Sequence, residues 1–199
     1  GGRRSPGCSR LTYRLSDLLG LGVMTSETET RRIVESIPAA VLHEAISALD
    51  VSHVLIVPDT HQKSLLASLA RDPNLKMLTF STEDEAICVN AGLWIGGAEA
   101  VVIIQNVGLF AGMNALRGVA MDMNVPTLLI VGQYGRDVSK TVEDNSATGV
   151  RLIEPVLDAM GVPHYRLDFA ADIGVLRTAY DRSRAERRPV VVLIGAPTS

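Results

Sequence analysis

The chain has 199 residues, of which 47% are hydrophobic and 21% are charged, and its formal net charge is −3. A chain of this length and composition can bury the core of one globular domain, which excludes a wholly disordered protein. The slightly acidic balance excludes the basic field that recruits nucleic acid or an anionic membrane surface, and no apolar run approaches the roughly 20 residues that span a bilayer.

Two features of the sequence bear on where the protein resides. The first 23 residues are rich in glycine, arginine and serine, and arginines precede an apolar stretch as in a signal peptide. That stretch is short, is interrupted by glycine and precedes no A-x-A-like site, so we expect residues 1–23 to be a poorly ordered extension and residues 24–199 to be a single domain. Cys8 and Cys88 give neither a disulfide framework nor a metal-binding spacing, which favours a reducing cytoplasm.

From about Pro38 the sequence alternates between helical patterns and short apolar strands. In chain order, the pattern predicts a helix over 39–49, a strand over 51–57, a helix over 62–70, a strand over 77–80, a helix over 83–95, a strand over 100–104, a helix over 110–123, a strand over 127–132, a helix over 150–160, a strand over 164–167, a helix over 173–186 and a strand over 190–194. The segment between residues 133 and 146 is polar and is expected to be a loop.

The apolar strands indicate how these elements assemble. Residues 101–104 (VVII), 127–131 (TLLIV) and 190–194 (VVVLI) are continuously apolar, as strands buried on both faces of a parallel sheet require. We therefore predict an α/β fold, a doubly wound, six-stranded and mainly parallel sheet with helices on both faces. Ligands of such sheets bind beyond the carboxyl ends of the strands, which selects the turns at 58–61, 81–83, 105–110 and 133–136.

Two stretches in the middle of the chain carry the most specific signal. Glu83 opens a helix of small residues and precedes a helix glycine, Gly92, by nine positions. The strand predicted at 100–104 is followed by QNVGLFAGMNAL, residues 105–116. In this order the stretches resemble the pyrimidine-binding (Pyr) domain of the thiamine-diphosphate-dependent 2-oxoacid decarboxylases. The likeness is strongest to the alpha subunits of sulfopyruvate decarboxylase and to the matching part of phosphonopyruvate decarboxylase.

The resemblance implies a catalytic role for Glu83. In that family the glutamate hydrogen-bonds N1′ of the cofactor's aminopyrimidine and favours the imino form of its 4′-amino group, which removes the proton from thiazolium C2. The carboxyl has to share a proton near neutral pH, and Ala86, Ile87 and Cys88 are compatible with the apolar surroundings that help it. Glu85 is a competitor for the role, and Glu83 could instead be only an acidic residue at a helix start.

The stretch QNVGLFAGMNAL is similar to the family's QNSGLGNSINAL. There the turn packs against the aminopyrimidine and the adjoining substrate space, which implies cofactor contacts for Asn106, Gly108 and Leu109. Gly108 permits a close backbone approach, and Asn106 offers a donor and an acceptor. The chain departs from the family at Val107 and at Phe110, which is bulky where the family has glycine, so Phe110 bears on the substrate. The alternative is a glycine-rich turn of another Rossmann-like domain, although no G-x-G-x-x-G or P-loop pattern is present.

The turn after the first predicted strand also corresponds to a family turn that reaches toward cofactor and substrate. It reads VPDTHQK, residues 57–63. The resemblance assigns Pro58 and Asp59 to the cofactor and His61 to the substrate. His61 and Lys63 could neutralise an acidic substrate tail, or His61 could transfer a proton, or both could simply be exposed.

Polar residues after the strand at 127–132 are further substrate candidates. Gln133 matches a position that lines the same cleft in the family. Arg136 and Lys140 suit an anionic substrate and suit a solvated loop equally well. Sulfopyruvate and phosphonopyruvate are the substrates that the resemblance suggests.

Half of the family's active site has no counterpart in the sequence. Family members that work alone also carry a PP domain, whose GDG…N motif holds Mg²⁺ and the diphosphate, and after Gly132 this chain has neither GDG nor GDS followed by a distal asparagine. The diphosphate carries several negative charges and needs that metal. The resemblance therefore implies a hetero-oligomer, in which a PP-domain beta subunit supplies the Mg²⁺ ligands and without which this chain is inactive.

The resulting hypothesis is the alpha subunit of a thiamine-diphosphate-dependent decarboxylase, a carboxy-lyase acting on a small 2-oxo acid with an acidic tail. A carboligase subunit of the same cofactor family is an alternative, and a non-catalytic Pyr-domain scaffold or regulator is another. Retention of Glu83 argues against a scaffold, which has no chemical need for that acid. The changes at Val107 and Phe110 argue mildly for it.

Overall fold

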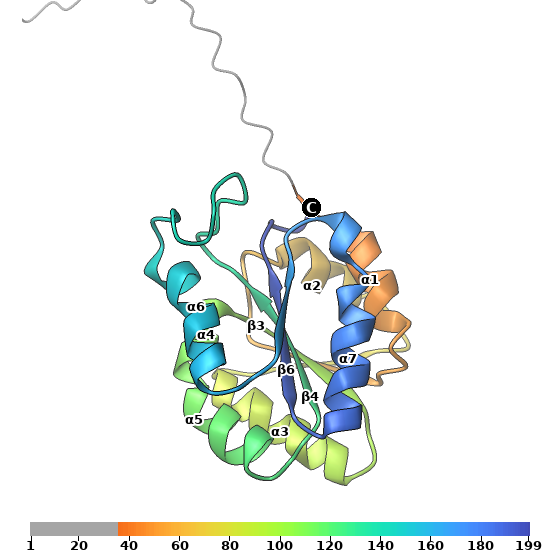
Figure 1. Ribbon diagram of the computed structural model, residues 1–199. Helices are drawn as coiled ribbons and strands as arrows, with labels where there is room; N and C mark the ends of the chain where they lie inside the picture. Colours follow the sequence, from red (N-terminus) through yellow and green to blue (C-terminus); the bar gives the residue numbers. More distant parts are fainter. Residues whose placement is uncertain (1–35) are drawn as a thin grey trace, which may run out of the picture. The chain divides into compact units, whose positions relative to one another are not determined.

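The six strands form a single parallel sheet in the order β2-β1-β3-β4-β6-β5 (Figure 1). The computed structural model describes residues 36–199, so the expected extension at residues 1–23 lies outside the described part of the chain. The strands are β1 (His53–Ile56), β2 (Lys76–Thr79), β3 (Ala100–Gln105), β4 (Thr127–Gly132), β5 (His164–Leu167) and β6 (Pro189–Ile194). The predicted α/β class and six-stranded sheet are confirmed.

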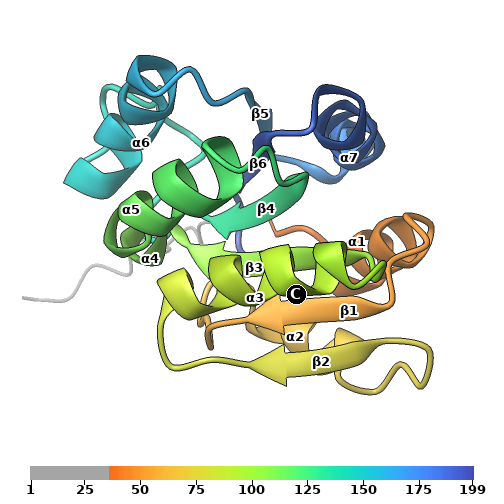
Figure 2. The same cartoon turned by 90° about the horizontal axis from the view of Figure 1, so that it is seen from below.

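Helices cover both faces of the sheet, as predicted (Figure 2). One face carries α1 (Ala39–Ser47), α2 (Lys63–Leu69) and α7 (Val175–Glu186). The other carries α3 (Glu83–Ile95), α4 (Asn106–Ala111), α5 (Met113–Ala115), the π-helical η2 (Leu116–Met121) and α6 (Thr148–Ala159). A 3₁₀ turn, η3 (Ala170–Asp172), follows β5.

Strand β3 illustrates why the central strands are apolar throughout. Val101 and Ile103 pack into the core under α1, α2 and α7, whereas Val102 and Ile104 pack into the core under α3 to α6. All four side chains are fully buried, because successive residues of a strand point to opposite faces and both faces are covered. The same alternation runs through β4 and β6, every residue of which is buried.

The residue ranges predicted for α3, β4 and β5 match the structure, but the prediction around α4 is wrong. A turn was expected at 105–110 and a helix from 110, whereas α4 starts at Asn106 directly after the strand. Gln105 has extended dihedral angles (φ −91°, ψ 163°) and ends β3. Asn106 Oδ1 then accepts a hydrogen bond from the Val107 N–H (2.9 Å), which satisfies one of the free donors of the first helical turn. Gly108 therefore lies inside a helix.

A buried polar contact fixes α3 on the sheet. Asn90 Nδ2 donates to Thr127 Oγ1 at 2.9 Å, and Thr127 Oγ1 donates in turn to the carbonyl of Val125 at 3.1 Å. Both Asn90 and Thr127 are buried. Because buried polar groups stabilise a fold only when they are hydrogen-bonded, this pair stabilises the packing of α3 on β4.

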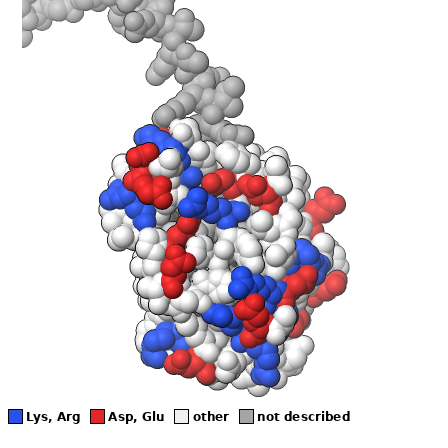
Figure 3. Space-filling model, in the orientation of Figure 1, with Lys and Arg blue, Asp and Glu red and all other residues white. Residues whose placement is uncertain are grey.

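The surface carries both signs of charge. On the face seen in Figure 3, basic and acidic side chains lie next to one another and no large patch of one sign is present. Ion pairs join opposite charges at the surface of the described residues, as in Arg166–Glu154 (2.6 Å) and Arg182–Glu186 (2.8 Å). Within residues 36–199, no helix is both long and apolar enough to cross a membrane.

Candidate functional site

The carboxyl ends of β1 to β4 bring the predicted site residues to one edge of the sheet. Because the strands are parallel, the segments that follow them emerge at the same edge. Asp59 and His61 follow β1, Glu83 follows β2, and Gln133 follows β4. Segments about 75 residues apart in sequence are thereby placed around one region.

Glu83 differs from the two acids beside it. Glu83, Asp84 and Glu85 all lie in the first turn of α3, but Asp84 and Glu85 are exposed whereas Glu83 is half-buried. The Thr82 side chain holds the pKa of Asp84 below its ordinary value by hydrogen bonding to the carboxylate. The Glu83 carboxyl has no hydrogen bond and no ion pair with any residue of the described chain. A half-buried acid without a protein partner is available to a ligand.

Gly108 provides the surface against which the Glu83 carboxyl lies. A Cβ added at Gly108 would overlap the carboxyl group of Glu83. A Cβ at Gly112, one turn later, would be 3.4 Å from Glu83 Cβ and 3.3 Å from Ile87 Cδ1. The two glycines let α4 approach α3 closely. The sequence indicated a close backbone approach at Gly108, and the structure shows that the approaching group is Glu83.

The neighbours of Gly108 are less accessible than the sequence implied. Asn106 is fully buried, and its Oδ1 accepts from Val107 N–H while its Nδ2 donates to the Tyr134 carbonyl (3.3 Å). Leu109 is fully buried in the core beneath α4. The side chains of Asn106 and Leu109 are therefore engaged within the protein, and Gly108 is the residue of the three that directly adjoins Glu83.

Asp59 is the centre of a buried hydrogen-bond network after β1. Pro58 is exposed, but Asp59 is only 5% exposed. Its Oδ1 accepts from Gln105 Nε2 (2.5 Å) and from the His61 N–H (2.7 Å), and its Oδ2 accepts from Gln62 Nε2 (3.0 Å). Neither Gln62 nor Gln105 was singled out from the sequence, because neither the spacing nor the residue type shows that strands β1 and β3 bring them to one carboxylate.

His61 and Gln133, the two polar substrate candidates, meet at the end of β6. His61 Nε2 donates to the Ile194 carbonyl (3.2 Å), and the Gln133 N–H donates to the same oxygen (2.9 Å). Burial lowers the pKa of His61, opposed by Asp59 and by the carbonyls of residues 194–196, so the imidazole is neutral at pH 7. Gln133 is buried, and its Oε1 has no partner among the described residues.

Phe110, the third substrate candidate, lies apart from these two. It is half-buried, and a Cβ added at Gly149, near the start of α6, would be 3.7 Å from its ring and 3.4 Å from Asn106 Nδ2. Phe110 therefore packs between α4 and α6, on the side of the sheet that carries Glu83.

Arg136 is engaged in a contact that the sequence did not predict. Its side chain is 4% exposed, and Nη2 donates to Asp168 Oδ2 (3.3 Å) at the end of β5. Nη1 donates to the carbonyls of Asp137 (2.6 Å) and Lys140 (2.8 Å), so the guanidinium shapes the loop after β4. Lys140 pairs with Asp137 (3.4 Å). Arg136 and Lys140 are both engaged by groups of the protein, so their charges are less available to neutralise a substrate.

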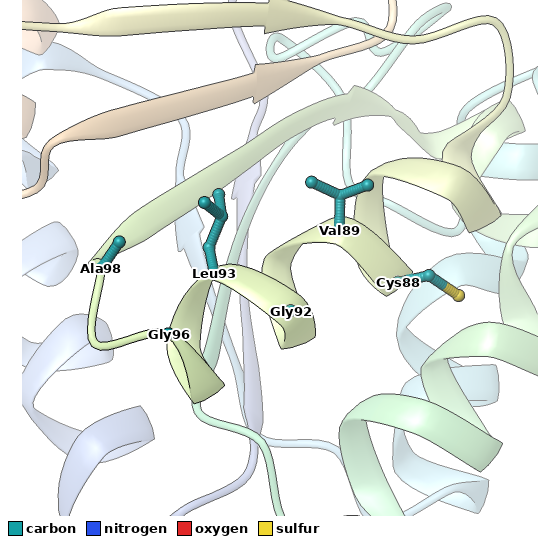
Figure 4. Close-up of a pocket in the computed structure, with 6 residues that line it drawn as sticks. All are labelled: Cys88, Val89, Gly92, Leu93, Gly96 and Ala98. Atoms are coloured by element: carbon teal, nitrogen blue, oxygen red, sulfur yellow. The ribbon is translucent and has the colours of Figure 1, made fainter.

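An apolar groove runs along α3 and the turn that follows it (Figure 4). Small and aliphatic residues line it: Cys88, Val89, Gly92, Leu93, Gly96 and Ala98. A Cβ at Gly92 would meet no atom within 4 Å. The glycine nine positions after Glu83 therefore faces outward and is not required by packing inside the described chain.

The arrangement of Glu83 and Gly108 fits the aminopyrimidine of thiamine diphosphate. A half-buried, unpartnered carboxyl on a flat glycine surface can hold a proton against a ring nitrogen. Residues 36–199 contain no group of three or more His, Cys, Asp or Glu side chains arranged to hold a metal ion.

A match to a family model identifies the α/β family to which the chain belongs. Residues 38–162 match the family described as "Thiamine pyrophosphate enzyme, N-terminal TPP binding domain", which is more than half of the chain. The chain belongs to this family. The matched range contains α1 to α6 and all of the predicted site residues.

Similar proteins are named as decarboxylases. The chain is 27% identical over 125 residues to sulfopyruvate decarboxylase subunit alpha of Methanocaldococcus jannaschii, covering 63% of this chain and 73% of that protein. It is 24% identical over 156 residues to the Methanococcus maripaludis protein of the same name, covering 78% and 92%. It is 30% identical over 149 residues to phosphonopyruvate decarboxylase of Streptomyces viridochromogenes, covering 75% of this chain but only 37% of that protein.

The comparisons confirm the family resemblance and agree with the predicted enzyme class, a thiamine-diphosphate-dependent decarboxylase. Two of the relatives are named as alpha subunits, and the match to them spans most of their length. The match to the Streptomyces viridochromogenes phosphonopyruvate decarboxylase spans about a third of its length. The thiamine-diphosphate domain therefore accounts for most of this chain and for one part of that longer relative.

Proposed function

We propose that this chain is the alpha subunit of a thiamine-diphosphate-dependent decarboxylase of a 2-oxo acid, and that Glu83 is its catalytic residue. The observation that carries the proposal is the Glu83 carboxyl, half-buried against Gly108 and without a partner in the described chain. A structural acid at a helix start would be expected to be exposed, as Asp84 and Glu85 are.

Thiamine diphosphate, when bound, supplies a carbon nucleophile and an electron sink for loss of CO₂. The part of this chain is to hold a proton at the pyrimidine nitrogen N1′ through the Glu83 carboxyl, and to present the ring with the flat surface of Gly108. The acid is partly shielded from water by α4, which strengthens a hydrogen bond to the ring. His61 and Gln133, further along the same edge, are proposed to face the substrate.

Sulfopyruvate-like or phosphonopyruvate-like acids are the proposed substrates, because the similar proteins are named for them. His61 is neutral and Arg136 is paired, so we propose that these two residues do not neutralise the acidic tail. Lys63 at the start of α2 is exposed and has no partner among the described residues, which leaves it as the cation of this edge that we propose for that role. A carboligase subunit remains the second candidate, since the same activated cofactor would serve it.

A PP-domain beta subunit is the proposed partner and the proposed source of the Mg²⁺ ligands. The names of the alpha-subunit relatives support a second subunit. The apolar groove along α3 supports it too, because an exposed apolar groove favours association with another protein surface. A reducing cytoplasm stays the predicted location, on cysteine usage alone.

The decisive experiment compares Glu83→Gln with Glu85→Gln in the complex with a PP-domain subunit. Glutamine can still hydrogen-bond N1′ but cannot protonate it, so C2-proton exchange of the bound cofactor should slow by about 10²–10⁴-fold in Glu83→Gln. Exchange is followed by NMR, and thermal unfolding should be unchanged because the Glu83 carboxyl loses no partner in the cofactor-free protein.

Glu85→Gln is the matched control, since Glu85 lies in the same helical turn but is exposed. Its exchange rate should stay within threefold of wild type. Exchange within threefold in Glu83→Gln would end the proposal for Glu83, and a large loss in Glu85→Gln would transfer the role to that residue.

The reaction itself is tested by co-expressing the chain with a PP-domain subunit and measuring CO₂ release from a panel of 2-oxo acids. Release from sulfonated or phosphonated acids supports the proposed substrate class. Carbon–carbon coupling without release of an aldehyde favours the carboligase. No turnover with any acid, although the complex binds cofactor, would favour the scaffold.

The split site is tested on the isolated chain. Calorimetry should show weak binding of thiamine diphosphate that Mg²⁺ does not strengthen, because the residues proposed here contact only the pyrimidine end. Tight, Mg²⁺-dependent binding to the isolated chain would contradict the proposed division of the site between two subunits.

A further inference from the structure

Gln105 is the polar side chain at the end of β3 that stays accessible. It is half-buried, whereas the next residue, Asn106, is fully buried with both ends of its amide hydrogen-bonded. The sequence drew attention to Asn106 because its amide can both donate and accept. In the structure Asn106 makes those hydrogen bonds within the protein. Gln105 is therefore the residue at this strand end whose side chain is available for a polar contact with a ligand.

Asp59 fixes the orientation of the Gln105 amide. Gln105 Nε2 donates to Asp59 Oδ1 at 2.5 Å, and the other donors to Asp59 are the His61 N–H and Gln62 Nε2. A Cβ at Gly132 would lie 2.6 Å from Asp59 Oδ2, so the carboxylate rests directly on the end of β4. A buried carboxylate held by three donors and 5% exposed is committed to the protein and has little surface left for a ligand.

Gln105 and Glu83 both lie at the carboxyl edge of the sheet. Gln105 immediately precedes α4, and Gly108 is three residues further on, within the first turn of that helix. One turn of helix rises about 5 Å. The Glu83 carboxyl lies on Gly108, so the Gln105 backbone is about one helical turn from the glycine that carries this carboxyl. Side chains alternate along β3, so Gln105, like Val101 and Ile103, points to the face of α1, α2 and α7, and Asp59 holds its amide there at the carboxyl edge between β1 and β3. Glu83 lies on the face of α3 and α4, so the two side chains reach this edge from opposite faces and flank a ligand that lies across the strand ends.

We propose that Gln105 contacts the 2-oxo acid and that Asp59 is a positioning residue that acts through Gln105. With one Nε2 hydrogen committed to Asp59, the amide presents Oε1 as an acceptor and the second Nε2 hydrogen as a donor. That neutral pair suits the keto and carboxylate oxygens that every 2-oxo acid carries, whatever its tail. The inference rests on the proposed function and deepens it, since it gives Asp59 a positioning role in place of cofactor contact.

The test uses the complex with the PP-domain subunit and four variants: Gln105→Ala, Asp59→Asn, the double variant, and Val107→Ala as control. Val107 is 59% exposed and close in sequence, and its side chain offers no hydrogen bond. Losing one substrate hydrogen bond should raise KM about tenfold in Gln105→Ala. C2-proton exchange should stay within threefold of wild type, because Glu83 is untouched. A merely structural role for Gln105 would not produce this split between KM and exchange.

Asp59→Asn should raise KM in the same direction, and the double variant should be no worse than Gln105→Ala alone, because the two residues act as a unit. If Asp59→Asn does not fold, Gln105→Asn replaces it, since that side chain is one methylene shorter and cannot reach Asp59 with the same geometry. Its KM should then match that of Gln105→Ala.

A KM within twofold of wild type in Gln105→Ala would overturn the substrate contact. An effect of Asp59→Asn that adds fully to that of Gln105→Ala would overturn the positioning role. These failures are separable from failure of the proposed function. A wild-type complex that neither exchanges the C2 proton nor releases CO₂ refutes that function before any variant is made.

Discussion

Two acids at the carboxyl edge of the sheet, Glu83 and Asp168, are packed in the same way but have opposite surroundings. An added Cβ at Gly108 would overlap the Glu83 carboxyl, and an added Cβ at Gly195 would overlap the Asp168 carboxyl. Asp168, however, accepts a hydrogen bond from the buried guanidinium of Arg136 at 3.3 Å. Glu83 has no partner in the described chain.

The comparison of Glu83 with Asp168 shows that close packing of an acid against a glycine does not by itself make the acid available for chemistry. A glycine beneath a carboxylate shows only that two segments approach closely. The partner then decides what the acid can do, because a carboxylate paired with a buried arginine loses that pairing when it turns to a ligand. We therefore expect variants at Glu83 and Gly108 to change cofactor chemistry, and variants at Asp168 to change stability.

The largest effect that would test this comparison is expected from Gly108→Ala. The new methyl group would occupy the position of the Glu83 carboxyl and would force this carboxyl away from the aminopyrimidine ring of the bound cofactor. Since a misplaced acid loses most of its contribution, C2-proton exchange in the complex should fall by about 10²-fold. NMR of the bound cofactor measures it.

Gly118→Ala is the control, because Gly118 lies further along the same helical stretch and a Cβ there meets no atom within 4 Å. It should leave exchange unchanged. Equal exchange in Gly108→Ala and wild type would mean that the Glu83 carboxyl does not need this surface, and the comparison with Asp168 would lose its basis.

Asp168→Asn is expected to destabilise the protein without affecting the cofactor. It leaves the Arg136 guanidinium, whose side chain is 4% exposed, without its counter-charge. Breaking such a pair from one side should lower the free energy of unfolding by about 3 kcal/mol, the low end of the usual range because Arg136 keeps two carbonyl partners. Urea unfolding measures the loss of stability. A slowed C2-proton exchange in Asp168→Asn would show that Asp168 also affects the cofactor, which would contradict the contrast with Glu83.

Phe110→Gly tests whether Phe110, on the same face of the sheet as Glu83, determines substrate specificity. Removing the half-buried ring should widen the space between α4 and α6, and so improve relative kcat/KM for bulkier or more highly charged 2-oxo acids by about tenfold. Phe110→Leu keeps most of the bulk and should shift the preference less. An unchanged ranking of substrates in Phe110→Gly would place the ring outside the pocket.

The smallest effect concerns pH. Burial lowers the pKa of His61 below its usual 6.5, so protons bind more readily to the unfolded chain. Its contribution to stability is therefore present above about pH 6.5 and is lost as the pH falls below that value. In urea titrations at pH 7.5 and 5.5, wild type should lose more stability on acidification than His61→Gln. Equal losses would show that His61 is not desolvated as the structure indicates.

The order and length of the elements could be predicted because they depend on local patterns. The unbroken apolar runs of β3, β4 and β6 require burial on both faces, and helix-length segments between them require parallel crossovers. The nine-residue spacing from Glu83 to Gly92 also lies within one helix, so the resemblance and the start of α3 were both readable from the sequence. The start of α4 was missed because a side-chain bond of Asn106 extends the helix to the strand end.

Which polar side chains remain free was decided only by the tertiary structure. Asp59 meets Gln105 across 46 residues, Arg136 meets Asp168 across 32, and Asn106 meets Tyr134 across 28. Hydrogen bonds and burial depend on distance in space, and a residue type carries no record of which distant group will lie beside it. The sequence by itself therefore determined that Glu83 opens α3 at the carboxyl edge, whereas the fold decided that Glu83 lies on Gly108 with its carboxyl unpaired.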